Sequence, residues 1–550
     1  MSAEITIFQA KKIVTMNPSN PEGTHIAVRE GRILGVGSLE EVAGWGDYEL
    51  DDTFKDQVLV PGFVEAHGHI QEGAFWEFAY VGYFDRMGAD GRLRRACRSF
   101  EDIIEALKEA EAELSDPHQS LLGWQLDPIY FPGERLTKAQ LDEVSTTRPI
   151  YVIHASGHMS TANSAALRKY NITKDSGPGV VLGADGEPNG ELHELAGMQL
   201  CKDEFMALIA SLGTPDAVRR YGQSARNGGV TTLTEMGAAQ TDNDKTIEML
   251  KSTVNDADFP ARLVVVYSTG FSTLSQEDQV KRVLSLRQES SEKLRFDHVK
   301  YLSDGSNQGF TGQILWPYYY KGEDQGAWNQ NPEQIKEGVL AFHKAGLQVH
   351  CHTNGNAAVE VFLEAVEYAL EQHPRFDHRH SAEHAQVTTH AQFRRMKALG
   401  MCANLFANHV HFWGDQHRDI IFGAERAKGM NACATALREG VPFSIHSDCA
   451  VTPLGGLTSM WSAVNRLTVS GKVLGEHERI SAYDALHAVT LGGAYLLKMD
   501  HELGSLECGK LADFAVLDKS PLDVDPIKIK DIKVWGTVVG GKKFPSPASA

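Results

Sequence analysis

The chain has 550 residues, a formal net charge of -19, 42% hydrophobic residues and 23% charged residues. This composition is typical of a folded globular protein and excludes a disordered or fibrous one, while the length favours a large core with an appended domain. The acidic charge repels phosphate backbones and anionic lipids, so we expect no nucleic-acid partner and no membrane association.

The cysteines and the N-terminal residues bear on the cellular compartment. The seven cysteines are odd in number, scattered and without a C-x-x-C pair, which argues against a disulfide framework or a zinc ribbon. Residues 1–16 lack the apolar stretch of a secretion signal, and the most apolar stretch, 75–84, is about half the ~20 residues of a membrane span. We therefore expect a cytoplasmic protein.

Short β-branched runs stand at both ends of the chain. Residues 5–16 and 25–37 are broken by Asn-Pro and Gly signals, and residues 511–517 and 532–539 have the same texture. We predict that the two termini pair into one composite β-sandwich domain of residues 1–60 and 505–550.

Residues 61–504 alternate short apolar runs with amphipathic segments. The predicted strands are 62–69, 229–235, 261–268, 298–302, 347–352, 380–384, 401–405 and 442–446. The predicted helices include 101–114, 332–345 and 357–371, whose apolar residues recur at helical spacing. Because strands that alternate with helices imply a parallel sheet, and about eight of them imply a closed barrel, the predicted fold class is α/β, a (β/α)8 TIM barrel.

One connection is too long for such a barrel. Residues 70–227 far exceed the usual βα loop of about 2–6 residues. We predict that this stretch, which follows the first barrel strand, is an insertion with its own structure that caps the barrel mouth.

The strongest local motif is the run from Pro61 to His69, which ends in His67-Gly68-His69. Residues two apart on a strand face the same side, so His67 and His69 can share a metal. A bare H-x-H pair is more often a surface feature. The positions of the other candidate ligands therefore decide between the two interpretations.

Each of several later strands is predicted to end in a possible ligand. These residues are Lys300, His352, His384 and Asp448. Active sites of (β/α)8 barrels lie at the C-terminal ends of the strands, so these groups are expected to converge on one spot. Their joint occurrence favours a metal site over a set of unrelated structural residues.

The chain resembles the amidohydrolase superfamily, in particular its amidohydrolase-3 branch of YtcJ-like and N-substituted formamide deformylase-like enzymes. The resemblance covers most of the chain and is carried by ordered motifs. They are "VLVPGFVEAHGHI", "RPIYVIHASGHMSTANSAAL", "NGELHE", "VKYLSDGS", "EHAQVT", "SIHSD" and "GSLECGKLADFAVLD". The last motif resembles the β-domain that such enzymes build from both termini.

The resemblance implies a ligand set. His67, His69 and Asp448 are similar to the ligands of the more buried metal, and His352 and His384 to those of a second one. Lys300 is similar to a lysine that is carboxylated to bridge both ions, which the low pKa of a desolvated amine makes feasible. The competing interpretation is an unmodified Lys300 paired with Asp304.

Imidazole and oxygen ligands without thiolate suit zinc and also admit manganese or iron. We therefore expect two Zn²⁺ per chain.

The expected reaction is cleavage of an amide, or a related ester or formamide. A metal lowers the pKa of bound water to about 7 and polarises a carbonyl, so that hydroxide attacks at neutral pH. Asp448 is the candidate acid/base, which takes the proton and returns it to the leaving group. His158 resembles a cap histidine that reaches the substrate, and it serves equally well as a structural residue.

Five residues placed near the mouth are candidate substrate contacts, and the aromatic ones among them favour an apolar or aromatic small molecule. The candidates are Trp124, Asp127, Trp316, His409 and Trp413. The chain departs from the family's common pattern at three places. His446 stands where glycine is common, Cys449 where tryptophan is common, and Asn356 where an acidic residue is common.

Other functions stay open on the same fold. A deaminase, an isomerase or a decarboxylase could use the same metal site, because fold does not fix the reaction. A non-catalytic regulatory protein is disfavoured, since every candidate ligand is present. A homo-oligomer is compatible with the sequence.

Overall fold

The computed structural model describes residues 4–131, 133–157, 159–177, 179–238, 241–321 and 326–547. The chain divides into two compact units. The first is made of Met1–His69 and Ala225–Ala550, and the second of Ile70–Ser224. The second unit falls within the stretch predicted to be an insertion, and its action as a cap stays a prediction.

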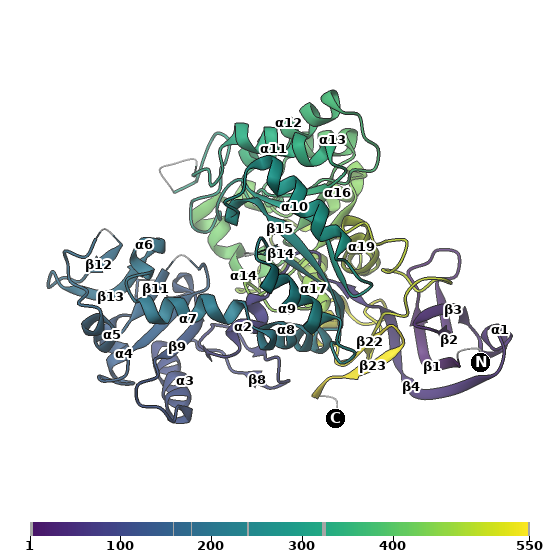
Figure 1. Cartoon of the computed structure of the whole chain (residues 1–550), viewed down its shortest axis with the longest axis horizontal. Coiled ribbons are helices and arrows are strands. Elements are labelled where there is room, and N and C mark those ends of the chain that lie inside the picture. The colour runs from purple at the N-terminus through teal and green to yellow at the C-terminus, as the bar shows by residue number, and fades with distance from the viewer. Residues whose placement is uncertain are drawn as a thin grey trace. The chain divides into compact units, whose positions relative to one another are not determined.

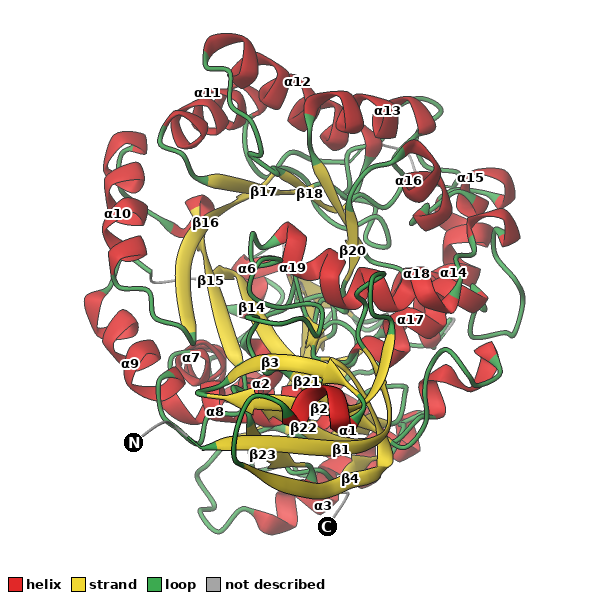
Figure 2. Cartoon of the chain, turned by 90° about the vertical axis from the view of Figure 1, so that its right-hand side faces the viewer, coloured by secondary structure: helices red, strands yellow, loops and turns green. Residues whose placement is uncertain are grey.

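A curled parallel sheet forms the centre of the first unit. Its strands are β5 (Phe63–Val64), β14 (Val230–Ala238), β15 (Arg262–Ser268), β16 (Leu294–Leu302), β17 (Gln348–His352), β18 (Ser381–His384), β19 (Cys402–Leu405) and β20 (Phe443–Ile445). The eight strands are hydrogen-bonded in the order β20-β19-β18-β17-β16-β15-β14-β5. Figure 2 shows the sheet curling, with helices around its outside. This is a TIM-barrel-like α/β fold, as the alternation of strands and helices predicts.

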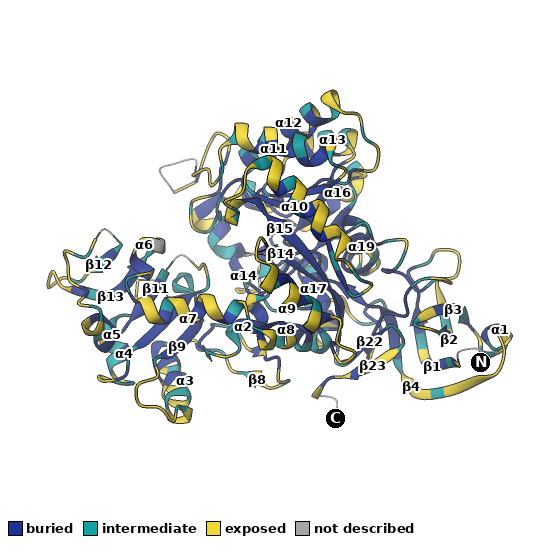
Figure 3. Cartoon of the chain, viewed as in Figure 1, coloured by how far each residue is buried: buried dark blue, intermediate teal, exposed yellow. Residues whose placement is uncertain are grey.

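Helices follow the strands and cover the outer face of the sheet. They are α9 (Asp244–Val254), α10 (Gln276–Gln288), α11 (Pro332–Lys344), α12 (Asn356–Gln372), α13 (His390–Leu399), α14 (Asn408–Gln416), α15 (Ala424–Lys428), α16 (Cys433–Glu439), α17 (Gly456–Asn465), α18 (Ala482–His487) and α19 (Gly493–Leu496). In α12, Val359, Phe362 and Val366 are buried at helical spacing. The outward turns of α9, α10 and α11 are exposed over buried strands (Figure 3).

The two edge strands of the sheet, β5 and β20, meet just beyond their ends. The backbone N–H of His69 donates to Cys449 O at 2.8 Å, and that of Asp448 donates to His67 O at 3.2 Å. The Glu65 carboxylate accepts from the Ser447 N–H at 2.8 Å and from its hydroxyl at 2.7 Å. These bonds hold His67, His69 and Asp448 together at the C-terminal ends of the strands.

Both ends of the chain share a second sheet. Its strands are β1 (Ile5–Val14), β2 (Glu22–Arg29), β3 (Arg32–Gly37), β4 (Tyr48–Pro61), β21 (Phe514–Leu517), β22 (Val534–Val539) and β23 (Lys542–Pro545), with the short helix α1 (Leu39–Ala43) after β3. The order is β23-β22-β21-β4-β1-β2-β3, with β21 antiparallel to β4. In Figure 1 the purple N-terminal strands and the yellow C-terminal strands belong to this sheet. The rings of Phe8, Phe54 and Phe514 pack together in its core, with centroids 5.7–6.3 Å apart.

The second unit has a sheet and a core of its own. Its six-stranded sheet joins β6 (Ala79–Tyr80), β9 (Leu121–Leu126), β10 (Ile150–His154), β11 (Met159–Ala162), β12 (Val180–Leu182) and β13 (Pro188–His193), and β7 (Arg86–Met87) pairs with β8 (Leu93–Arg94). Its helices are α2 (Gln71–Phe75), α3 (Phe100–Glu113), α4 (Lys138–Asp142), α5 (Ser164–Lys169), α6 (Glu194–Met198) and α7 (Lys202–Leu212), and α8 (Pro215–Asn227) ends just beyond it. Leu107, Leu141, Ile150 and Val152 are fully buried in one cluster.

Across the described ranges of both units, no helix combines the length and the apolar character that a membrane crossing requires.

Candidate metal centre

Two histidines from the first strand and an aspartate after the last strand form one cluster. His67 Nε2 lies 3.5 Å and His69 Nε2 lies 3.3 Å from Asp448 Oδ1. One ligand atom from each residue lies within 4.8 Å of the others. The cluster brings together the three residues that the sequence resemblance assigned to the more buried metal.

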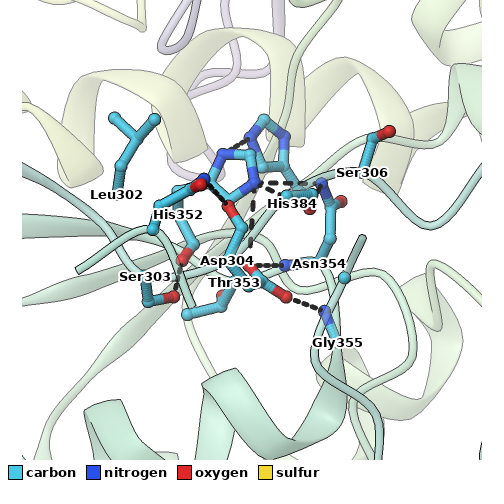
Figure 4. Close-up of polar contacts among 12 residues, drawn as sticks. Leu302, Ser303, Asp304, Ser306, His352, Thr353, Asn354, Gly355 and His384 are labelled. Atoms are coloured by element: carbon cyan, nitrogen blue, oxygen red, sulfur yellow. Dashed lines mark hydrogen bonds and ion pairs between the residues drawn. The ribbon is translucent and has the colours of Figure 1, made fainter. Parts of the chain in front are cut away.

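A second pair of imidazoles faces the same region from the middle of the sheet. His352 ends β17 and His384 ends β18, and His352 Nδ1 lies 3.1 Å from His384 Nε2 (Figure 4). Asn354 Nδ2 lies 3.1 Å from His352 Nε2, and Gly305 O lies 3.2 Å from the same nitrogen. His352 Nδ1 and His384 Nε2 are therefore the two nitrogens that converge.

Left-handed backbone at two strand ends directs side chains into the site. His384 has φ 65° and Asp448 has φ 50°. Non-glycine residues adopt this conformation rarely, and such residues concentrate at functional sites. The turn at His384 explains how Glu383 and His384, adjacent in sequence, both point into the barrel, although neighbours on a regular strand face opposite sides.

Lys300 lies on β16 and is 2% exposed. Its Nζ has no hydrogen-bond partner among the residues that the structure describes. Burial lowers the pKa of Lys300 below its ordinary range, although the charges of Glu383 and Asp448 oppose the shift. An amine in this state is neutral more readily and can act as a nucleophile.

Asp304 does not pair with Lys300. Its carboxylate accepts hydrogen bonds from the backbone N–H groups of Gln313 (2.9 Å), Asn354 (3.1 Å) and Gly355 (2.8 Å). Figure 4 shows the bonds to Asn354 and Gly355. Burial raises the pKa of Asp304 to about 7 despite these bonds. The pairing that the sequence left open as an alternative is therefore not formed, and Asp304 instead fixes the loop after His352.

A buried carboxylate supports the ligands from behind. Glu383 is fully buried, and it accepts from His67 Nδ1 at 2.6 Å, from His350 Nδ1 at 2.7 Å and from Asn404 Nδ2 at 2.8 Å. Because Nδ1 of His67 donates to Glu383, its Nε2 keeps the lone pair that a metal needs. His350 Nε2 continues the chain to His298 Nδ1 at 3.2 Å.

Asp448 and His69 influence each other's ionisation. Burial raises the pKa of Asp448, but the hydrogen bond and charge of His69 outweigh it and the net shift is downward. Burial lowers the pKa of His69, yet its contacts with Asp448 and Glu235 raise it to about 9. Asp448 is therefore the anionic member of the cluster.

His446 is a further imidazole in the centre, and sequence analysis marked it only as a departure from the family's pattern. It is fully buried, and neither of its ring nitrogens has a hydrogen-bond partner within the described ranges. His67, His384 and His446 form a second group whose ligand atoms lie within 4.8 Å of one another.

The predicted substrate contacts are distributed unevenly. His409 and Trp413 on α14 are buried, and His409 packs on Phe406, which stacks on His446. Trp316 is 81% exposed. Trp124 is buried among aromatic rings of the second unit, and Asp127 caps a short helical turn there by accepting from the Ile129 N–H. His158 lies outside the described residues.

The donor set fits a divalent metal. Buried imidazoles and a carboxylate converge beside Lys300. Several polar atoms of this group have no hydrogen-bond partner in the part of the chain that the structure describes, namely Lys300 Nζ, His384 Nδ1 and both nitrogens of His446. A bound cation satisfies such atoms, and nitrogen with carboxylate oxygen is a donor set that zinc accepts.

Glu383, His350, His298 and the role of His446 were not predicted from the sequence. A signal existed for two of them. His350 lies two residues before His352, and His298 two before Lys300, so each shares the inward face of its strand with a predicted ligand. No periodic signal marks Glu383, because the left-handed turn at His384 breaks the alternation.

Comparisons with known proteins identify the family of the chain and its fold. The sequence profile described as the amidohydrolase family matches residues 55–543. Among curated proteins, LONG AFTER FAR-RED 3 of Arabidopsis thaliana is 28% identical over 96% of this chain and 90% of its own length. Putative amidohydrolase YtcJ of Bacillus subtilis is 25% identical and covers 98% of both chains. N-substituted formamide deformylase of Arthrobacter pascens is 26% identical and covers 96% of both.

Among solved structures, an uncharacterised metal-dependent hydrolase of Pyrococcus horikoshii superposes with a TM-score of 0.71 at 20% identity, covering 95% of this chain and 99% of its own. An adenosine deaminase of Xanthomonas campestris with bound zinc has a TM-score of 0.53 at 15% identity, covering 98% of this chain and 92% of its own. At these identities the likeness shows a shared fold.

Proposed function

The chain belongs to the amidohydrolase superfamily, in its amidohydrolase-3 branch, and we propose that it is a metal-dependent hydrolase that cleaves the C–N bond of an amide or formamide. The observation that carries the proposal is the convergence of His67, His69 and Asp448 with the His352–His384 pair. A relative is named as an N-substituted formamide deformylase, which supports the choice of bond.

A bound divalent metal lowers the pKa of a water molecule and polarises the substrate carbonyl. In this chain His67, His69 and Asp448 would hold one ion, and His352 and His384 a second, with zinc as the expected metal. Asp448 Oδ1 faces His67 and His69, so Oδ2 is the oxygen that would accept a proton from the attacking water. The same oxygen would return that proton to the leaving nitrogen.

We further propose that Lys300 carries a carboxylate on Nζ that joins the two ligand groups. The support is its burial, its lowered pKa and the lack of a partner for Nζ in the described part of the chain. Lys300→Ala should lower kcat/KM at least about hundredfold, and added short carboxylates should restore part of it by supplying oxygen ligands. A bare amine in the active enzyme, found by mass spectrometry under conditions that preserve carbamates, would contradict this proposal.

The substrate we propose is a small amide with a bulky apolar group. The support is the buried aromatic wall of Phe406, Trp413 and the His409 ring beside His446. His158, Trp124, Asp127 and Trp316 remain proposed contacts of the same substrate, the first three through a proposed cap formed by residues 70–227. The enzyme is proposed to act in the cytoplasm. A homo-oligomer is compatible with this proposal.

The finer architecture is also a proposal. We infer a fully closed (β/α)8 barrel at residues 61–504, supported by the hydrogen bonds that join the segments after β5 and β20. We infer a β-sandwich at residues 1–60 and 505–550, supported by one core cluster that draws residues from both halves of the terminal sheet.

The test combines metal analysis with a substrate panel. The purified protein should carry about two divalent ions per chain, lose activity on chelation and regain it on addition of zinc. N-formyl and N-acyl amines of graded size and polarity should be hydrolysed, with kcat/KM rising with aromatic size. Activity that is indifferent to chelators would overturn the hydrolase mechanism. Turnover of aminopurines, or of substrates that isomerise or lose carbon dioxide, in place of amides would replace it by another reaction of the same fold.

A further inference from the structure

His446 lies where three imidazoles meet. It follows β20, and its ring lies 4.7 Å from the ring of His67 and 5.1 Å from that of His384, measured between centroids. The rings of His67 and His384 are 4.6 Å apart. The third neighbour of His446 is the apolar ring of Phe406, which stacks on it at 4.8 Å between centroids.

The two ring nitrogens of His446 are buried without hydrogen-bond partners in the described ranges, which is energetically unfavourable. A neutral imidazole has one N–H donor and one lone pair, and burying either without a partner is unfavourable. Both nitrogens of His446 are buried and neither has a partner in the described ranges, whereas His67 and His350 each donate to Glu383. A metal ion that accepts the lone pair of one His446 nitrogen would remove part of the cost of burying this ring.

The spacing of the His67 and His446 rings fits a shared ion. Zinc lies about 2.0–2.1 Å from an imidazole nitrogen, so two imidazoles bound to one tetrahedral ion have centroids roughly 5 Å apart. The observed separation of the two centroids is 4.7 Å. The ligand atoms of His67, His384 and His446 also lie within 4.8 Å of one another.

His67 links this group to the cluster of His69 and Asp448. Its Nδ1 is occupied by Glu383, so only Nε2 is free, and one lone pair binds one ion. His67 therefore serves one ion, the ion that it shares with His69 and Asp448, while His384 keeps Nε2 for the ion that it shares with His352. His446 adds a neutral nitrogen donor to the ion that His67 binds.

We propose that His446 is a fifth histidine ligand of the metal centre, bound to the same ion as His67. This inference rests on the proposed metal-dependent function. A further imidazole increases the nitrogen content of the site, so the centre should prefer zinc or cobalt to manganese, which favours oxygen ligands.

The test measures metal binding without turnover. Metal-free wild type, His446→Gly and His446→Gln are titrated with Co²⁺, and affinity is obtained by competition with a chelator while the visible absorption spectrum is recorded. His446→Gly should weaken Co²⁺ binding at least about tenfold, change the spectrum and bind Mn²⁺ nearly as wild type does. Added imidazole should restore the wild-type spectrum in His446→Gly, because the deleted ring leaves room for it. Circular dichroism establishes that each variant is folded. If His446→Gly is not folded, the Co²⁺ titration of His446→Gln decides the test.

Two controls separate the possible failures. His378 is a buried histidine that precedes β18, and its Nε2 contacts Leu399 O. The variant His378→Gln should leave Co²⁺ affinity unchanged. His67→Ala should abolish binding at this position, and wild-type affinity in that variant would overturn the proposed function itself. If His67→Ala loses the metal while both His446 variants keep wild-type affinity and spectrum, His446 is not a ligand. An altered KM in those variants would then make it a substrate contact.

Discussion

Glu383 shows how much of the metal centre depends on residues that need not touch a metal. Its two oxygens accept from His67, His350 and Asn404, so the carboxylate sets the ring orientation of His67 and keeps its Nε2 free. Such partners of metal ligands commonly contribute about 10–100-fold in metal affinity. The effect is electrostatic as well as geometric, because a carboxylate makes the imidazole a stronger donor.

Glu383→Gln should therefore weaken metal binding by about 10–100-fold while the protein stays folded. The amide offers one acceptor in place of two, and its NH₂ group faces an imidazole N–H. Chelator competition with Zn²⁺ measures the change, and Glu360→Gln, whose carboxylate contacts Arg395 at the surface, is the matched control. Equal affinities in Glu383→Gln and wild type would mean that the hydrogen bond to His67 has no role in binding.

The individual ligand candidates were open to prediction to different degrees. His352 and Lys300 follow from the rule that strand ends meet at one edge of a barrel, combined with the period of two along a strand. His446 and Glu383 do not follow from it. Their orientation depends on left-handed backbone at His384 and on the hydrogen bonds between the segments after β5 and β20, which are tertiary features.

At the opposite end of β17 and β18, three buried histidines hold fixed tautomers. The Val349 N–H donates to His380 Nδ1, and the His380 N–H donates to His378 Nδ1, each at 3.0 Å. His378 Nε2 lies 2.7 Å from Leu399 O, and His343 Nδ1 lies 2.8 Å from His380 Nε2. Each accepting nitrogen must stay unprotonated, so the cluster requires neutral rings.

This requirement gives the stability a pH dependence. Burial lowers the pKa of His378 to about 4, and His343, Arg375 and Lys498 reinforce the shift. In the unfolded chain the ring titrates near its ordinary pKa of about 6.5, so between pH 6.5 and 4 the unfolded state binds the proton and the folded state does not. The free energy of unfolding should fall as pH decreases, by about 2 kcal/mol from this residue between pH 7 and pH 5.

Urea unfolding of the metal-free protein at pH 7, 6 and 5 measures this contribution. His378→Gln should show a shallower pH dependence than wild type, because glutamine cannot take up the proton. Parallel curves for the two proteins would contradict the assignment.

A buried ion pair fastens the terminal sheet to the barrel. Arg262 begins β15, and its Nε lies 2.6 Å and its Nη2 3.0 Å from the two oxygens of Asp513, just before β21. Both residues are buried. Removing one partner of such a pair leaves an uncompensated charge and costs about 3–5 kcal/mol.

Asp513→Asn should therefore lower the free energy of unfolding by roughly 3 kcal/mol, measured by urea denaturation. Asp258→Asn, which removes an exposed contact with Lys542, should leave it nearly unchanged, because a solvated ion pair contributes little. Similar small losses in both variants would show that Glu292 alone compensates Arg262.

The sequence predicted the positions of strands whose residues are continuously buried, and it did not predict a strand whose residues are mostly exposed. The barrel strands from β14 to β20 are short runs of buried residues bounded by loops, and their predicted ranges differ from the observed ones by a few residues. β4 was not predicted as a strand, because its first residues, Tyr48 to Thr53, are mostly exposed and carry no alternation of apolar and polar side chains. β4 is held as a strand by its hydrogen-bonded pairing with β1, which the sequence pattern of β4 does not indicate.

On the scale of the whole molecule, the two units differ in how they arise from the sequence. The first unit is discontinuous, since its terminal sheet needs both ends of the chain and its barrel is interrupted after β5. The second is a single continuous segment. The length of the gap between predicted strands predicts an insertion at the place where this compact unit lies. Its sheet order, with β6 beside β9 and β13 between β12 and β11, has no counterpart in the sequence pattern.

The second unit should fold on its own. Residues 70–227 keep α8 whole, and the segment has the length at which a domain buries about two thirds of the surface of its unfolded chain. Its six-stranded sheet is complete, and Leu107, Leu141 and Ile150 are fully buried in a cluster drawn entirely from this segment. The isolated segment should therefore show the circular dichroism of a mixed α/β protein and one cooperative transition in urea. Ile150→Asp places an unpaired charge in that core and should abolish the transition. A broad, non-cooperative loss of signal in the unsubstituted segment would mean that this stretch of chain needs the rest of the protein to fold.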